Sequence, residues 1–188
     1  VATDLVPGDT NGLRDVFLRD FETATTTLVS VSASGGAASG SSSSASISGD
    51  GRYVAFVSSA SNLVAGDGNG KPDIFVRDAI LGTTLRVSVG TGGAEADGSS
   101  ALPSISENGE YVAFESSATN LFVGDTNSKT DVVRVHRATL ATVRVSVDSG
   151  GGDSNGDSWS ASVSSDGRRV AFASTAADLH SDDVDATA

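Results

Sequence analysis

The chain has 188 residues, a formal net charge of −12 and a sequence pI of about 4.3. Its lysines are Lys71 and Lys129 alone, and no basic stripe recurs along it, which excludes the electrostatic footprint of a nucleic-acid-binding protein. No apolar run approaches the roughly 18 residues that a membrane-spanning helix needs. Because the chain has no cysteine, disulfide bonds give no information about its cellular compartment.

One pattern recurs along the chain at a fixed spacing of 58 residues, without insertion or deletion. Phe56, for example, aligns with Phe114 and Phe172. A period of this size is typical of a supersecondary unit that cannot bury its apolar face alone and therefore stacks on its neighbours.

Hydrophobicity of period two, with turn residues between the runs, predicts four strands in each unit. In the second unit they are residues 45–48, 52–58, 73–78 and 84–89. Residues 52–58 (RYVAFVS) are apolar on both faces, so we expect that strand to be covered on both sides. Residues 84–89 (TLRVSV) alternate, so we expect that strand to be half exposed. An antiparallel unit of this kind is typical of a propeller blade, and the predicted fold is an all-β propeller of four-stranded blades.

Three motifs in these units resemble the TolB-like β-propeller repeat, whose blades are similar to those of WD-repeat propellers. They are a Ser-x-Asp-Gly turn, a Val-Ala-Phe strand and an Asp-Ile-Phe-Val-x-Asp strand. The turn lies at 48–51, 106–109 and 164–167, the second motif at 54–56, 112–114 and 170–172, and the third at 15–20 and 73–78, decaying to DVVRVH at 131–136. The resemblance covers the whole chain and implies the fold, but no activity, because propellers host many unrelated functions.

In this frame the chain holds about three blades. Residues 1–44 are the C-terminal half of a blade with the following loop, 45–102 and 103–160 are full blades, and 161–188 are the N-terminal half of another. Closed propellers typically have four to eight blades. Two interpretations follow: a portion of a longer propeller, or a homodimer in which the two half-blades of each protomer pair with those of the other and close a six-bladed ring.

Acidic and amide side chains recur in the loop between the second and third strands of each unit. The three sets are Asp9, Asn11 and Asp15; Asp67, Asn69 and Asp73; and Asp125, Asn127 and Asp131. Calcium takes six to eight oxygen ligands, and a short turn can direct carboxylate, amide and carbonyl oxygens at one centre. We therefore predict structural Ca²⁺ at these loops, weaker in the third, where Ser128 replaces a glycine. The alternative is that these side chains only form Asx-turns.

Catalysis finds little support in the residues. His136 and His180 are isolated departures from the repeat pattern. Residues 152–156 (GDSNG) match Gly-x-Ser-x-Gly, but they lie in a long polar loop and not on the strand-to-helix turn that a nucleophile elbow requires. We therefore expect a non-enzymatic scaffold or recognition module for a protein or carbohydrate, with ligand specificity in the long polar loops 32–44, 90–102 and 148–158, which we expect to be extended and hydrated.

Two alternatives remain beside this function: a structural surface-assembly component, and the accessory propeller of a larger hydrolase. Richness in Ser, Gly, Thr and Ala, few lysines and the absence of an initiator Met favour a secreted or cell-envelope protein.

Overall fold

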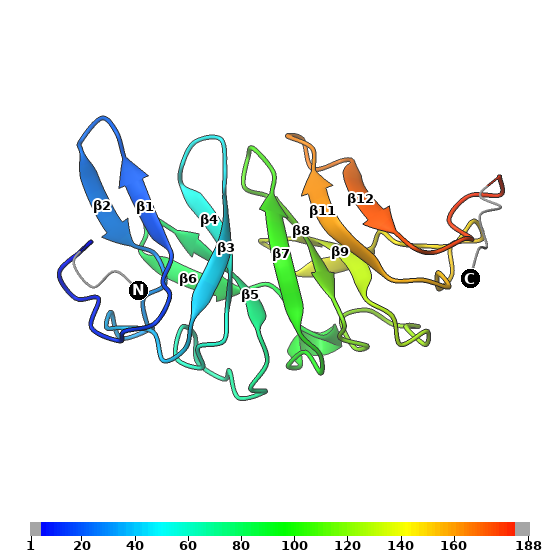
Figure 1. The fold of residues 1–188 in the computed structure, drawn as a ribbon, viewed down its shortest axis with the longest axis horizontal. Coiled ribbons are helices and arrows are strands. Elements are labelled where there is room, and N and C mark those ends of the chain that lie inside the picture. The colour runs from blue at the N-terminus through cyan, green and yellow to red at the C-terminus, as the bar shows by residue number, and fades with distance from the viewer. Residues whose placement is uncertain (1–4, 183–188) are drawn as a thin grey trace.

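The computed structural model describes residues 5–182; residues 1–4 and 183–188, at the outer ends of the two predicted half-blades, lie outside the described residues. Four antiparallel sheets stand side by side in a row (Figure 1). The strands are β1 (Phe17–Asp20), β2 (Thr25–Leu28), β3 (Ser42–Ile47), β4 (Tyr53–Ser58), β5 (Asp73–Asp78), β6 (Thr83–Arg86), β7 (Ser100–Ile105), β8 (Tyr111–Ser116), β9 (Asp131–His136), β10 (Ala141–Arg144), β11 (Ser158–Val163) and β12 (Val170–Ser174), with a 3₁₀ turn, η1, at Thr91–Gly93.

The order of strands confirms the predicted all-β propeller architecture. β3-β4-β5-β6 and β7-β8-β9-β10 form four-stranded sheets in sequence order, while β1-β2 and β11-β12 are two-stranded. β9 pairs with both of its neighbours although its sequence departs from the strand motif. Consecutive sheets are linked near the first strands, where the Ile105 backbone N–H donates to Ser46 Oγ at 3.2 Å and the Val163 N–H donates to Ser104 Oγ at 3.1 Å.

The first strand of each unit begins earlier than the hydrophobic pattern predicts. β3 starts at Ser42 rather than residue 45, and its register with β4 shifts between Ser43 and Ser46. Ser44 has a φ of 52° at this shift, and Leu102 and Ser160 repeat the conformation in β7 and β11. A bulge inserts an extra residue and interrupts the alternation of side chains, so a period-two search finds only the half of the strand that follows it.

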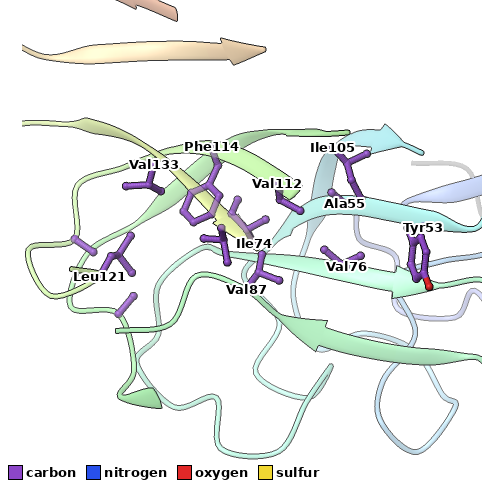
Figure 2. Packing of buried hydrophobic residues seen from close by; sticks show 13 residues of the cluster. Tyr53, Ala55, Ile74, Val76, Val87, Ile105, Val112, Phe114, Leu121 and Val133 are labelled. Carbon is purple, nitrogen blue, oxygen red and sulfur yellow. The ribbon is translucent and has the colours of Figure 1, made fainter. Parts of the chain in front are cut away.

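The hydrophobic core lies between the sheets. Phe56 and Phe75 are fully buried on the side of the first sheet, with ring centroids 5.9 Å apart. On the opposite side, Ile74 and Val76 of β5 face Val112 and Phe114 of β8 (Figure 2). Both faces of β4 and β5 are therefore covered, as we expected of a strand without polar alternation.

Each complete blade also contacts its neighbour through a tyrosine and a glycine. Tyr53 lies against Gly109 of the next unit, and Tyr111 lies against Gly167, so closely that a Cβ at either glycine would collide with the ring. The guanidinium of Arg137 stacks on the Tyr53 ring, 3.8 Å from its centroid. Of the helical segments in residues 5–182, none is long and apolar enough to cross a membrane.

Candidate functional site

Each predicted loop places its asparagine in an Asx-turn. Asn11 Oδ1 accepts a hydrogen bond of 2.8 Å from the Leu13 backbone N–H, and Asn69 and Asn127 accept the equivalent bonds from Lys71 and Lys129 at the same distance. Ser128 adopts a φ of 55°, close to the 65° of Gly70, so the third loop keeps the turn at the cost of a left-handed serine.

The asparagine amides also connect each loop to a distant segment. Asn11 Nδ2 donates to the Ala38 carbonyl at 3.2 Å, Asn69 Nδ2 to Ala96 at 3.1 Å, and Asn127 Nδ2 to Ser154 at 3.0 Å. The side chains thus make turns and tertiary hydrogen bonds, as the Asx-turn alternative requires.

The closing aspartate of each loop is bound by a buried serine. Ser88 Oγ donates to Asp73 Oδ1 at 2.6 Å and accepts from the Ile74 backbone N–H at 2.9 Å. Ser30 makes the same pair of contacts with Asp15, and Ser146 makes them with Asp131. One carboxylate oxygen of each aspartate is thereby satisfied, and the other can meet a second charge. In Asp73 this other oxygen, Oδ2, also accepts a hydrogen bond of 3.0 Å from Asn69 Nδ2.

In the second loop that second charge belongs to Arg86. Its Nη1 lies 3.0 Å from Asp67 Oδ1, 3.6 Å from Asp73 Oδ2 and 3.2 Å from Glu95 Oε1, and its side chain is 8% exposed. Glu95 also accepts the Gly68 and Asn69 backbone N–H groups at 2.6 and 3.1 Å. One guanidinium therefore joins three carboxylates in what we call the arginine clamp, defined by Arg86, Asp67, Asp73 and Glu95.

The third loop repeats the clamp with looser geometry. Arg144 forms an ion pair with Asp153, which stands in the column of Glu95, and its Nη1 lies 3.8 Å from Asp131 Oδ2. Asp125 Oδ1 and Asp131 Oδ2 are buried and have no hydrogen-bond partner among the described residues. In the second loop neither Asp67 nor Asp73 has an unpartnered buried oxygen, because Arg86 contacts both and Asn69 Nδ2 donates to Asp73 Oδ2.

The first loop has the same carboxylates but lacks the arginine. The residue in the column of Arg86 is Leu28, and Ala37 stands in the column of Glu95. Asp9 is 5% exposed, and both of its carboxylate oxygens, together with Asp15 Oδ2, are buried without a hydrogen-bond partner in the described part of the chain. Within residues 5–182, these two carboxylates thus have no neutralising side chain.

Burial acts on the charges of the two clamped loops. It is the largest cause of the raised pKa of Asp67, Asp73, Asp125 and Asp131, and the arginines act in the opposite direction. Hydrogen bonding, first of all from the Gly68 backbone N–H, lowers the pKa of Glu95. These shifts show that a buried aspartate in this position carries a desolvation cost which a nearby cation reduces.

The arginines and their acidic partners were not predicted from the sequence. Simple alternation in residues 84–89 places Arg86 opposite Leu85 and Val87, yet Leu85 is 37% exposed whereas Arg86 and Val87 are both buried. A signal was present, because Arg86 and Arg144 share one column of the 58-residue frame and Glu95 and Asp153 share another.

The long polar loops also differ from the expectation of extended, hydrated segments. Val31 bridges to Ala37, Val89 to Glu95, and Val147 to Asp153, so each loop folds back on itself. This fold-back is what delivers Glu95 and Asp153 to the clamps. Among residues 5–182, no three Asp, Glu, His or Cys side chains are grouped so as to hold a metal ion.

Stacked four-stranded antiparallel sheets with covered inner strands define a β-propeller. No protein-family model matches the chain, and no curated protein matches it. Solved structures do match, and they show that the fold is that of the TolB-like β-propeller, as the sequence motifs predicted.

Three of these structures show the extent of the likeness. A putative TolB from Agrobacterium tumefaciens is 21% identical with a TM-score of 0.55 over 89% of this chain and 47% of its own. TolB from Acinetobacter baumannii is 18% identical with a TM-score of 0.50 over 85% and 34%. The tricorn protease is 13% identical with a TM-score of 0.51 over 87% and 13%. The chain therefore spans less than half the length of these proteins.

Proposed function

We propose that the chain is a non-catalytic β-propeller scaffold or recognition module, secreted or in the cell envelope, whose first carboxylate loop binds Ca²⁺ for stability. Its partners are a protein or a carbohydrate, bound at the fold-back loops (residues 32–44, 90–102 and 148–158), and a second copy of the chain. The single observation that supports the calcium site is the contrast between the first loop and the arginine clamp at the same place in the next blade.

Physical chemistry favours a cation at the first loop. A buried carboxylate without a partner is costly, and breaking a buried ion pair typically costs about 3–5 kcal/mol. Asp9 and Asp15 present three unpartnered buried oxygens, at the place where Arg86 joins Asp67 and Asp73. Oxygen ligands of this kind suit Ca²⁺, with the remaining positions of its shell supplied by backbone carbonyls and water.

We propose lower calcium affinity at the other two loops than at the first. At Asp67, Asn69 and Asp73 the guanidinium already supplies positive charge, so we expect little calcium affinity there. Asp125, Asn127 and Asp131 form the intermediate case, because Arg144 leaves two buried oxygens unpartnered. We therefore expect calcium affinity to fall from the first loop to the third and then to the second.

Thermal unfolding with and without calcium tests the proposal. Calcium should raise the Tm of the parent chain, because a ligand that binds only the folded state at 100 times its Kd adds about 2.7 kcal/mol. Asp9→Asn should abolish the shift, whereas Glu22→Gln, which removes an exposed carboxylate from the β1–β2 turn, should keep it. An unshifted parent, or an equal shift in Asp9→Asn, would contradict calcium binding at this loop.

A second candidate is the accessory propeller of a larger hydrolase. It is supported by the match to the tricorn protease, of which this chain covers 13%. A hydrolase segment in the same reading frame would favour this function, whereas concentration-dependent polymers of the isolated chain would favour a structural surface-assembly component.

A further inference from the structure

Glu95 and Asp153 each bind the carboxylate loop of their own unit through backbone N–H groups as well as through the arginine. Glu95 Oε1 accepts the Gly68 N–H at 2.6 Å and the Asn69 N–H at 3.1 Å. Asp153 Oδ2 accepts the Thr126 N–H at 3.0 Å and also the Thr126 hydroxyl. The loop therefore presents donors that hold a carboxylate, and in these two units the fold-back loop supplies it.

The first unit has the same backbone donors but a different residue opposite them. Ala37 stands in the column of Glu95, and its bridge to Val31 repeats the fold-back of the other units. The donors in this unit are the N–H groups of Thr10 and Asn11, and neither donates a hydrogen bond to an acceptor within residues 5–182. Thr10 is exposed, so an acceptor from outside the chain can reach these donors.

The unbalanced aspartates of the first unit lie next to these donors. Asp9, directly before Thr10 in the chain, is 5% exposed, and both of its carboxylate oxygens lack a hydrogen-bond partner among the described residues. In the second unit Arg86 Nη1 contacts Asp67 at 3.0 Å and Glu95 at 3.2 Å, so one positive charge joins the loop to the fold-back carboxylate. A calcium ion in place of that guanidinium takes six to eight oxygen ligands, which can include a carboxylate from outside the chain.

The surroundings of this position favour an acidic sugar as the source of the carboxylate. The chain has a net charge of −12, which repels a partner that carries many negative charges, and residues 32–38 (SASGGAA) add no positive charge. A uronic acid carries a single carboxylate among neutral hydroxyl groups. Those hydroxyl groups suit the exposed side chains of Thr10 and Ser39, at the loop and at the fold-back segment.

We propose that the calcium ion of the first loop and the N–H groups of Thr10 and Asn11 together bind the carboxylate of a uronic acid. The ligand carboxylate takes the position that Glu95 occupies in the second unit. The inference rests on the calcium site of the proposed function, and it names the carbohydrate that the first fold-back loop recognises.

Titration calorimetry of the calcium-loaded chain with D-glucuronate and with D-glucose, which has the same ring without the carboxylate, tests this inference. We expect D-glucuronate to bind more tightly than D-glucose by about tenfold or more, because the site is built to pair with a carboxylate. Equal affinities for the two sugars would overturn the inference. N-acetyl-glutamate amide is the third probe, and its binding about tenfold more tightly than D-glucuronate would replace the sugar by an acidic peptide.

Two reciprocal variants locate the ligand. Ala37→Glu supplies the carboxylate of the other units, so it should lower the affinity for D-glucuronate by about tenfold or more while the chain still binds calcium. Glu95→Ala removes a side chain that is 39% exposed and frees the Gly68 and Asn69 N–H groups beside Arg86. Because Arg86 supplies the positive charge there, this variant should bind D-glucuronate in EDTA, where the parent should not. Unchanged D-glucuronate affinity in Ala37→Glu would overturn the inference.

The same experiments separate this inference from the calcium proposal. A parent chain that binds calcium but not D-glucuronate refutes only the carboxylate site. If the parent binds no calcium, the proposed function fails at its own step, and Glu95→Ala in EDTA still decides whether the backbone donors capture a carboxylate. Binding of D-glucuronate by that variant would support the capture, and no binding would refute it.

Discussion

Arg86 lies among Asp67, Asp73 and Glu95 with almost none of its side chain in water. The adjacent blade has the same aspartates and the same serine but a leucine in the arginine column. Buried charges of one sign must be balanced locally, and a protein can do so with a covalently attached cation or with a bound ion. We therefore propose that the residue at this one column determines whether a loop is balanced by an arginine or by a bound ion.

The recurring acids and amides were predictable at this scale because they appear in register in every unit. Their neutralising partners were not predictable. The alternation of residues 84–89 places Arg86 on the exposed face of the strand, and only the tertiary structure shows that its side chain is buried. A search for the balancing charge in the same repeat frame would have identified Arg86 and Arg144. It would also have shown that Leu28 breaks the column.

The Arg52–Asp78 ion pair gives a prediction about pH. Hydrogen bonds from Arg52 are the largest cause that lowers the pKa of Asp78 to about 2, from a usual value of 3.8. Because the folded pKa is the lower one, the pair stabilises the fold above the unfolded pKa, and this contribution is lost as the pH falls from 3.8 toward 2. Arg52→Gln should therefore be less stable than the parent at neutral pH, and the gap should close over that acidic range.

Urea unfolding of both proteins across the pH series measures this gap. Asp67 and Asp73 have raised pKa values and change stability in the opposite direction. They do so equally in parent and variant, so their effect cancels in the difference. A gap that is constant with pH would contradict the assignment of the Asp78 shift to Arg52.

At the scale of the element, the blade contact between Tyr53 and Gly109 explains a requirement for glycine. Gly109 has a φ of 70°, and its missing side chain makes room for the tyrosine ring of the preceding blade. Gly51 occupies the same turn with a φ of 73°, but no atom lies within 4 Å of its Cβ position. The two glycines therefore share the backbone requirement and differ only in packing.

Gly109→Ala and Gly51→Ala separate the two effects. Both should lose about 1–2 kcal/mol for a left-handed alanine, and Gly109→Ala should lose a further 1–3 kcal/mol or so from overpacking against Tyr53. Denaturant unfolding of the two variants measures the difference. Equal losses would show that the tyrosine contact does not hold the blades together.

Element boundaries were predictable where a strand pairs along its whole length and not where the backbone departs from the ladder. The strand predicted at 84–89 is β6, Thr83–Arg86, because the chain leaves the ladder after Arg86. β5 was predicted to the residue, because Asp73–Asp78 pairs without interruption with β4, and Phe75–Asp78 also pairs with β6. β3 was not, because Ser44 with a φ of 52° interrupts its alternation. The fold-back loops were missed because Gly, Ser and Asp content indicates a loop but carries no information on the tertiary hydrogen bonds that order it.

At the scale of the whole molecule, the fold was predictable because the sequence of one unit shows that it must pack against a neighbouring unit on each side. A strand such as residues 52–58, apolar on both faces, needs a sheet on each side, and the 58-residue repeat supplies one. The balance of charge at each loop was not predictable in the same way. The aspartate columns predicted a calcium site at every loop, weaker only in the third, whereas the structure gives each loop a different balance of charge.

A native mass spectrum of the chain in calcium, compared with that of Leu28→Arg, tests the central claim most directly. Leu28 ends β2 as Arg86 ends β6, so an arginine there should take the place of the ion, while Leu28→Gln controls for polarity without charge. We predict about one high-affinity calcium per chain in the parent and in Leu28→Gln, and none in Leu28→Arg. An equal calcium count in Leu28→Arg and the parent, or no calcium in the parent, would contradict the account.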